Sequence, residues 1–379
     1  MSAFAVRGTV LLGYSFAPGV VLIEDGRIAA ILHGSQDRYV ATTIYDAPII
    51  APGFIDLQVN GGFGVEVGKD PDAIRTLAAR LPETGVTAFL PTIITSPPAV
   101  YAEAYRAFHM ERVANGARPL GFHIEGPFLA PTKHGAHRRD LIERADPGLL
   151  DMLLEGDAMR LITLAPERPN APELMRQLHA RGVLISLGHT DATYEQFVAG
   201  VDAGARMATH LYNAMAPFGH RAPGAVGAAL LDDRVTVGLI ADGIHAHPAS
   251  LQLAFRAKGV GHIALVSDIM TAAGMPPGRY TLGGQSVIVD GTAARLVDGT
   301  LAGSLLTMDQ AVRNMVRWTD ATVADALQMA SAVPARLLGL NDRGEIRIGA
   351  VADLVLLDND LMVRATIIDG EIVHERGDA

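Results

Sequence analysis

Cysteine is absent from the sequence, so disulfide bonds and thiolate chemistry are excluded, and any zinc ion would need His and carboxylate ligands. Long apolar runs are also absent, because no stretch approaches the roughly 18 residues that a membrane-spanning helix requires. The first residues lack the basic segment, apolar segment and cleavage site of a secretory signal. We therefore expect a cytoplasmic protein without a membrane partner.

Positive charge is scarcer than negative charge. The sequence has 31 Lys and Arg against 41 Asp and Glu, a formal net charge of -10, whereas nucleic-acid binding depends on Lys and Arg contacts to phosphate. A nucleic-acid partner is therefore not expected, although a small phosphorylated molecule would need only a local cluster of cations. Hydrophobic residues make up 49% of the 379 residues, which is typical of a globular enzyme with one barrel and a small accessory unit.

Short strand patterns occupy both ends of the chain. Asp25 and Asp369 each begin an Asp-Gly dipeptide that separates two short apolar runs, and this dipeptide signals a tight hairpin because it tolerates positive φ. Neither end alone buries enough surface to be stable. We therefore expect residues 1–50 and 341–379 to form one small β-sandwich.

Between these ends, in residues 51–340, short apolar runs alternate with longer helical patterns. Eight runs lie at about residues 53–60, 86–93, 120–125, 160–165, 183–188, 206–210, 235–241 and 262–267. Helices are expected in the gaps, for instance at 72–81, 99–114, 171–180, 192–203 and 248–258. The repeats predict an α/β fold of the (β/α)8 TIM-barrel type, whose active site lies at the carboxyl ends of the strands. A doubly wound open sheet is disfavoured because no Gly-x-Gly-x-x-Gly follows the first strand.

Residues with catalytic potential gather at the carboxyl ends of these runs. Since side chains alternate along a strand, Gln58 and Asn60 share one face of the first strand, and Glu125 ends the third. The other strand ends carry His189, His210, Asp242, His245 and Asp268. In a closed barrel these positions converge on one mouth.

Two histidines and one glutamate of this set have the composition of a catalytic metal site. A lone His at a strand end is more often a hydrogen-bonded structural residue, but Glu125, His189 and His210 together supply two imidazoles and a carboxylate and leave a position for water. Asp268 follows an apolar run, where an unpartnered carboxylate is costly to bury. We expect it to act as general acid and base, and the alternative is a structural salt bridge.

Weaker signals point to ligand-binding loops. Arg221 lies in a loop with Gly and Pro after the sixth run, and arginine suits bidentate phosphate binding, although an exposed loop arginine is usually only solvated. The segments 60–62 and 301–304 contain Gly residues, which allow a ligand to approach the backbone but are equally common in turns.

Seven motifs run in order along nearly the whole chain. They are Pro52-Gly53-Phe54-Ile55-Asp56, His123-Ile124-Glu125-Gly126-Pro127-Phe128, Leu187-Gly188-His189-Thr190, Thr209-His210-Leu211-Tyr212-Asn213-Ala214-Met215, Ala241-Asp242-Gly243-Ile244-His245, Val266-Ser267-Asp268 and Leu301-Ala302-Gly303-Ser304. Together they resemble the motifs of the amidohydrolase superfamily, and within it those of the N-acetylglucosamine-6-phosphate deacetylases. The resemblance implies that Glu125, His189 and His210 bind a metal and that Asp268 is the catalytic acid and base.

The resemblance also implies further site residues. His137 would polarise the acetyl carbonyl, with His134 as the alternative. The residues expected to contact the sugar and its phosphate are Gln58, Asn60, Ala136, His137, Asn213, Ala214, Arg221, Asp242, His245, Leu301, Ala302 and Gly303. In similar enzymes a neighbouring subunit supplies part of the phosphate site, so a homodimer is implied.

The first strand departs from the pattern of many superfamily members, which carry His-x-His there for a second metal. This chain has Gln58-Val59-Asn60 instead, and Glu167 ends the fourth run where a bridging lysine would be needed. Because amides are poor zinc ligands, we predict one divalent ion per subunit, with zinc first and iron, cobalt or manganese as alternatives.

The resulting hypothesis is deacetylation of N-acetylglucosamine 6-phosphate to glucosamine 6-phosphate and acetate. A metal-bound hydroxide would attack the acetamide carbonyl, His137 and the metal would hold the oxyanion, and Asp268 would pass its proton to the amine. One alternative is a deacetylase of another N-acetyl hexosamine phosphate, such as N-acetylgalactosamine 6-phosphate. A ring-opening cyclic-amide hydrolase would need the missing His pair and lysine, and a non-catalytic binding protein would be expected to have lost some of the ligands.

Overall fold

Eight parallel strands form the centre of the molecule. The computed structural model describes residues 4–33, 43–110, 115–155 and 157–377. The barrel strands, in the spatial order β15-β14-β13-β12-β11-β10-β8-β5, are β5 (Phe54–Val59), β8 (Val86–Ile94), β10 (Phe122–Glu125), β11 (Met159–Leu164), β12 (Leu184–Leu187), β13 (Met207–Ala208), β14 (Thr236–Leu239) and β15 (Ile263–Leu265). Each coincides with one of the expected apolar runs, so the predicted (β/α)8 fold is confirmed.

The first and last strands are joined through the segment that follows β15. Asp268 donates its backbone N–H to Gln58 O at 3.0 Å, and Asn60 donates its own to Ile269 O at 2.9 Å. Val59 and Ile269 form a parallel bridge at the same place. This junction brings the polar end of β5 next to Asp268.

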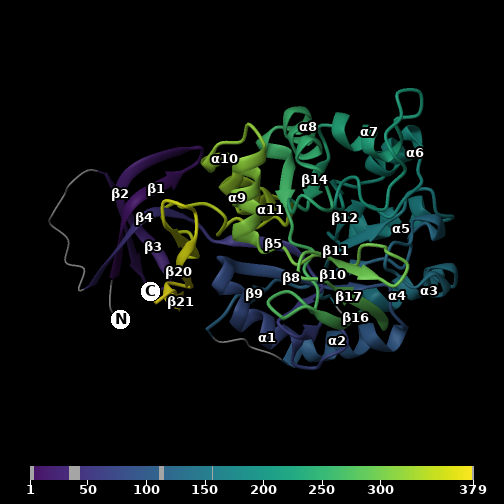
Figure 1. Ribbon diagram of the computed structural model, residues 1–379, viewed down its shortest axis with the longest axis horizontal. Helices are drawn as coiled ribbons and strands as arrows, with labels where there is room; N and C mark the ends of the chain where they lie inside the picture. The colour runs from purple at the N-terminus through teal and green to yellow at the C-terminus, as the bar shows by residue number, and fades with distance from the viewer. Residues whose placement is uncertain (1–3, 34–42, 111–114, 156, 378–379) are drawn as a thin grey trace.

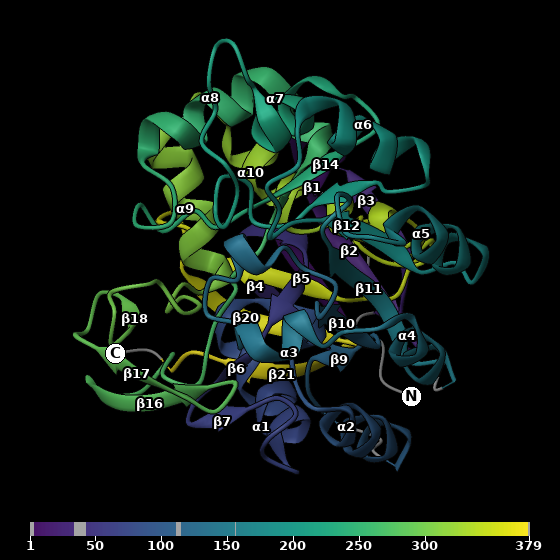
Figure 2. The same cartoon turned by 90° about the vertical axis from the view of Figure 1, so that its right-hand side faces the viewer.

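Helices surround the barrel (Figure 2). They are α1 (Ala73–Arg80), α2 (Pro98–Met110), α4 (Pro147–Leu154), α5 (Ala171–Ala180), α6 (Tyr194–Asp202), α7 (Gly224–Leu231), α8 (Pro248–Lys258), α9 (Met308–Trp318), α10 (Val323–Ala330) and α11 (Ala332–Leu337), while α3 (Arg139–Glu143) lies in the loop after β10. In α5 the buried side chains recur at helical spacing, at Ala171, Leu174, Met175 and Leu178. The expected helices 171–180 and 248–258 have the observed bounds, and the part of the expected helix 99–114 at residues 111–114 lies outside the described residues.

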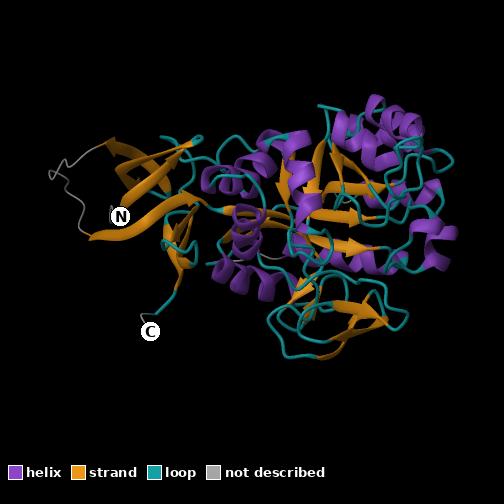
Figure 3. Ribbon diagram, turned by 45° about the horizontal axis from the view of Figure 1, so that its top comes forward, coloured by secondary structure: helices purple, strands orange, loops and turns teal. Residues whose placement is uncertain are grey.

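The two ends of the chain share one sheet on the side of the barrel (Figures 1 and 3). Its strands, in the order β21-β20-β19-β4-β1-β2-β3, are β1 (Phe4–Leu12), β2 (Ser15–Glu24), β3 (Arg27–His33), β4 (Thr43–Pro52), β19 (Leu354–Leu357), β20 (Val363–Ile368) and β21 (Glu371–Glu375). Asp25 and Asp369 have φ of 51° and 49° in the expected hairpins. An antiparallel bridge between Arg27 and Val351 draws the β2–β3 hairpin toward the C-terminal segment. The expected joint folding of the two ends is confirmed, and the boundaries at residues 50 and 340 stay predictions.

A three-stranded sheet that the sequence analysis did not foresee follows β15. It consists of β16 (Gly278–Leu282), β17 (Gln285–Val289) and β18 (Ala294–Leu296), labelled at the lower left of Figure 2. Short elements complete the loops, namely β6 (Gly61–Gly62), β7 (Val65–Glu66), β9 (Arg118–Pro119) and the 3-10 turns Leu81–Thr84, Pro131–Lys133 and Val260–His262. Within the described parts of the chain, no helix has the length and apolar character required to cross a membrane.

Candidate metal centre and active site

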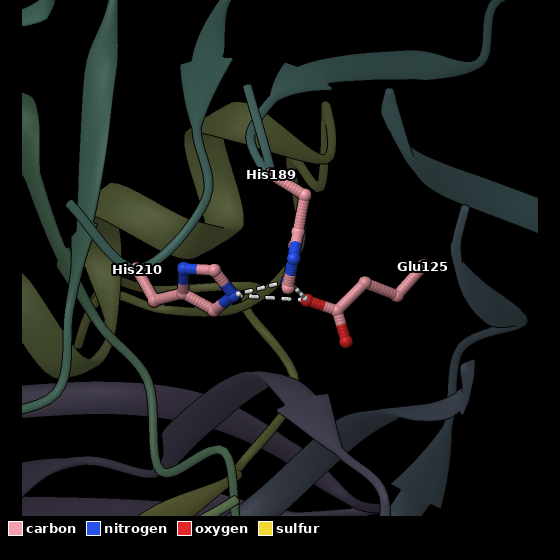
Figure 4. A group of neighbouring side chains, drawn as sticks. All are labelled: Glu125, His189 and His210. Carbon is pink, nitrogen blue, oxygen red and sulfur yellow. Dashed lines mark hydrogen bonds and ion pairs between the residues drawn. The ribbon is translucent and has the colours of Figure 1, made fainter. Parts of the chain in front are cut away.

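Two histidines and a glutamate from three strand ends bring their side chains together (Figure 4). Glu125 is the last residue of β10, and His189 and His210 follow β12 and β13. Glu125 Oε1 lies 3.0 Å from His210 Nε2 and 3.3 Å from His189 Nε2, and the two imidazole nitrogens are 3.2 Å apart. One ligand atom from each residue therefore lies within 4.8 Å of the other two.

The protonation of these side chains fits a divalent ion. His189 Nδ1 donates to Lys133 O at 2.8 Å, which leaves the Nε2 lone pair facing the other two side chains, as in histidines that bind metal. Burial alone would raise the pKa of Glu125, but the neighbouring His189 and His210 side chains hold it well below its usual range. A buried carboxylate and two imidazoles form the donor set of a catalytic zinc site.

Gln58 of β5 and Asn60, just after this strand, each donate a hydrogen bond to an acidic side chain. Gln58 Nε2 donates to Glu125 Oε1 at 3.0 Å, and Asn60 Nδ2 donates to Asp268 Oδ1 at 2.6 Å. Both amides thus act as hydrogen-bond donors to carboxylates. The prediction of one metal ion stays a prediction, which rests on the lack of imidazoles at the positions of the His-x-His motif.

Asp268 is buried beside the metal centre without a salt bridge to any described residue. Burial raises the pKa of its carboxyl to about 7, the negative charge of Glu125 adds to the shift, and His210 and His245 oppose it. A carboxyl group with a pKa near 7 can both accept and release a proton at neutral pH. The structural salt bridge, the alternative considered from the sequence, is not observed.

Three of these residues have left-handed backbone conformations, which L side chains rarely adopt. The φ values are 49° at His189, 27° at His210 and 52° at Asp268. Ser304 N–H donates to Asp268 O at 2.7 Å and so helps to hold the last of them. Such strained conformations cluster at functional sites, because only the surrounding structure keeps them in place.

His137 presents one ring nitrogen to the metal centre. Thr95 N–H donates to His137 Nδ1 at 3.2 Å, and His137 Nε2 lies 3.7 Å from Glu125 Oε2. Burial lowers the pKa of His137 to about 3, so the ring is neutral. Because Nδ1 accepts, its proton lies on Nε2, where it can be donated to a carbonyl oxygen. His134 lines the cavity too, but its Nδ1 has no partner among the described residues.

A cavity of about 560 Å³ opens at this end of the barrel. Most of the site residues expected from the sequence line it, namely Asn60, Glu125, Ala136, His137, His189, His210, Asn213, Ala214, His245, Asp268, Leu301 and Gly303. Residues that the sequence analysis did not select also line it, including Leu282, Arg295 and Thr300. The Gly283-Gly284 dipeptide between β16 and β17 was a hairpin signal that could have revealed this part of the wall.

Four expected contact residues lie outside the cavity lining of a single chain. Gln58 supports Glu125, as described above, and the backbone N–H of Ala302 donates to the small sheet at Ala294 O. Asp242 Oδ2 accepts a 2.6 Å hydrogen bond from His245 Nδ1, so Asp242 orients a ring that does line the cavity. Arg221 is exposed in its loop.

Comparisons with known proteins point in one direction. The pattern of the amidohydrolase family matches residues 49–373. An N-acetylglucosamine-6-phosphate deacetylase from Danio rerio is 43% identical over 345 residues, 86% of this chain and 85% of the relative. An N-acetylgalactosamine-6-phosphate deacetylase from Escherichia coli O157:H7 is 41% identical over 356 residues, 92% of this chain and 93% of the relative.

A solved structure matches the whole fold. It is a mutant N-acetyl-D-glucosamine-6-phosphate deacetylase from Mycobacterium smegmatis in complex with N-acetyl-D-glucosamine-6-phosphate, and it superposes with a TM-score of 0.91 at 34% identity. The superposition covers 98% of this chain and 100% of that one.

Proposed function

Because the chain belongs to the amidohydrolase family, and within it to the N-acetylglucosamine-6-phosphate deacetylases, we propose that it hydrolyses N-acetylglucosamine 6-phosphate to glucosamine 6-phosphate and acetate. The observation that carries the proposal is the meeting of Glu125, His189 and His210 in a cavity that Asp268 also lines. A divalent ion held by these three side chains, with zinc as our first choice, would supply a Lewis acid and lower the pKa of bound water.

The protein's own residues account for the proton transfers. Asp268, as a carboxylate, accepts a proton from the attacking water and later delivers it to the amine nitrogen as the C–N bond breaks. The Nε2–H of His137 donates to the acetyl oxygen, on which negative charge develops. Water thus adds to the acetyl carbon, and the products are acetate and the free amine.

The test is acetate release from N-acetylglucosamine 6-phosphate by the purified protein, with and without a chelator. We expect the chelator to abolish acetate release and added zinc to restore it, because the side chains of the site cannot replace the metal ion as a Lewis acid. Unphosphorylated N-acetylglucosamine is the comparison substrate. Failure of the untreated, metal-loaded protein to release acetate from any N-acetyl hexosamine phosphate would refute the proposal.

The epimer N-acetylgalactosamine 6-phosphate is the second candidate substrate. A relative with that printed activity is 41% identical over 92% of this chain, close to the 43% of the Danio rerio relative. Both substrates would use the same carboxylate and imidazoles, since the acetamide is common to them. The ratio of kcat/KM for the two epimers decides between them.

A homodimer with a shared phosphate site forms part of the proposal. Arg221 is exposed and does not line the cavity of its own chain. Phe218, three residues before Arg221, and Leu231, the last residue of α7, are 59% and 68% exposed, and large exposed apolar side chains are found at contact surfaces. A second copy that covers this surface would bring Arg221 to the neighbouring cavity.

Mixing two variants of low activity tests the shared site. Arg221→Ala lacks the loop cation, and Asp268→Asn lacks the acid and base. In a mixed dimer, the cavity that keeps Asp268 would receive Arg221 from the other chain, so activity should reappear after dissociation and reassociation. If Arg221 serves its own cavity, the mixture stays as inactive as its components, and light scattering shows separately whether a dimer forms.

A further inference from the structure

The three-stranded sheet forms a fixed wall of the cavity. Leu282 and Val287 pack in one buried cluster with Ile94 and Ala136 of the barrel mouth. Gln285 Nε2 donates to Ala136 O, next to His137. These contacts hold the sheet against the barrel, so side chains that it points into the cavity have defined positions relative to the metal centre.

Arg295 lies on β18 of this sheet and lines the cavity. Its strand is linked to the catalytic segment through backbone hydrogen bonds. Ala302 N–H donates to Ala294 O at 3.0 Å, and Ser304 N–H donates to Asp268 O at 2.7 Å. The strand that carries Arg295 is therefore anchored to the segment that also holds Asp268.

Arg295 is an unneutralised cation in an acidic protein. Lys133, the other Lys or Arg side chain of the lining, pairs with Asp191 at 3.2 Å. Arg295 forms no salt bridge with any described residue, and its Nη1 donates to Gly299 O at 3.0 Å. The other N–H groups of its planar guanidinium can donate hydrogen bonds to a ligand. A phosphate dianion is the ligand for which this geometry is best suited.

We propose that Arg295 binds the phosphate group of the substrate within its own subunit and gives the enzyme a preference for phosphorylated amino sugars. The inference rests on the deacetylase function proposed above. The protein carries a formal net charge of -10, which repels a phosphorylated substrate. A cation on the cavity wall offsets that repulsion and selects for the phosphate.

The test compares Arg295→Met and Arg295→Lys with Arg279→Met. Arg279 is a matched control, because the strand register places it opposite Ile288, which in turn lies opposite Arg295. Arg279 is exposed on β16 but does not line the cavity. All three variants are assayed as metal-loaded enzyme with phosphorylated and unphosphorylated N-acetylglucosamine.

We expect Arg295→Met to lower kcat/KM for the phosphorylated substrate about 10- to 100-fold, mainly through KM, as for loss of a hydrogen bond to a charged group. The unphosphorylated substrate should change by less than about twofold, Arg295→Lys should retain part of the preference, and Arg279→Met should match the unaltered enzyme. An equal loss on both substrates, or no loss on either, would overturn the proposal.

Binding measurements keep this inference separate from the proposed function. Calorimetry with glucosamine 6-phosphate and with glucosamine reports phosphate recognition without turnover. If the unaltered protein binds glucosamine 6-phosphate but releases no acetate, the deacetylase function fails, and Arg295 is judged by whether Arg295→Met weakens that binding. If the unaltered protein binds neither compound and releases no acetate, both proposals fail.

Discussion

The barrel mouth and the region of the terminal sheet each bury an aspartate, but the two aspartates have different partners. Asp353, which directly precedes β19 of that sheet, accepts hydrogen bonds from Arg343 Nη1 and from Asp369 N, both at 2.9 Å. Asp268 of the barrel accepts its side-chain hydrogen bond from the neutral amide of Asn60. Burial raises the pKa of Asp353 to about 6 against the charge of Arg343, and that of Asp268 to about 7.

The difference in partners distinguishes a structural aspartate, Asp353, from one that is available for proton transfer, Asp268. A buried carboxylate held by a buried guanidinium is a structural link, because removal of either member leaves an uncompensated charge. Asp268 has no cation bonded to it and borders an open cavity. Its proton can therefore be exchanged with a bound molecule. The following changes test this contrast, beginning with the largest expected effect.

Asp268→Asn should lower kcat by about 10² to 10⁴, the usual contribution of a general acid or base. The substitution preserves size, and the new side-chain oxygen can still accept from Asn60, so metal content and thermal stability should not fall. Acetate release and metal analysis of the purified variant measure both quantities. Near-full activity would show that Asp268 does not transfer the proton.

Asp353→Ala should produce the opposite pattern. It leaves the buried Arg343 side chain, 8% exposed, with the half-exposed Asp342 at 3.3 Å as its remaining carboxylate. The free energy of unfolding should therefore fall, by up to about 3–5 kcal/mol, while folded molecules keep their turnover. The control is Asp46→Ala, because the Arg7–Asp46 pair of the same sheet is exposed and should contribute only about 0–1 kcal/mol. Urea denaturation gives the stabilities. A folded Asp353→Ala protein without activity would contradict the contrast.

His137→Phe removes the hydrogen-bond donor that we propose for the acetyl oxygen and keeps a ring of similar size. We expect a loss of about 10² to 10³ in kcat with little change in KM, as when an oxyanion donor is removed. His134→Phe, the matched variant in the same loop, should lose less than about tenfold. A larger loss in the His134 variant would assign the carbonyl contact to that residue instead.

Asn60→Leu should shift the acidic side of the pH profile of kcat/KM to higher pH. The hydrogen bond from Asn60 favours the Asp268 carboxylate and lowers its pKa, so its removal raises that pKa. Asp268 must be ionised to accept a proton, and activity should therefore be lost at a higher pH, by about half to one unit for one hydrogen bond. Gln58→Leu should weaken metal binding without this displacement. If the acidic side of the pH profile does not shift in Asn60→Leu, a group other than Asp268 controls the loss of activity at low pH.

The barrel strands could be predicted from the sequence because parallel strands buried on both faces appear as continuous apolar runs. Every residue of β5 and β8 is buried. The convergence of Glu125, His189 and His210 followed from the rule that carboxyl ends of barrel strands meet at one mouth. The meeting of these three distant residues could therefore be predicted from the barrel topology.

The wall of the cavity could not be predicted in the same way. The strands of the small sheet are three to five residues long, and none has a continuous run of buried residues, so they resemble loops in a search for apolar runs. The contact of Thr95 with His137 joins residues 42 positions apart. Such pairing depends on where two loops pack, which local patterns do not encode.

The proposed function requires that Glu125, His189 and His210 together hold one divalent ion. Anomalous diffraction from metal-loaded crystals, combined with a count of metal ions per chain, tests it most directly. We expect a single ion whose protein ligands are these three side chains. An ion bound elsewhere, or a second ion coordinated by Gln58 and Asn60, would contradict it.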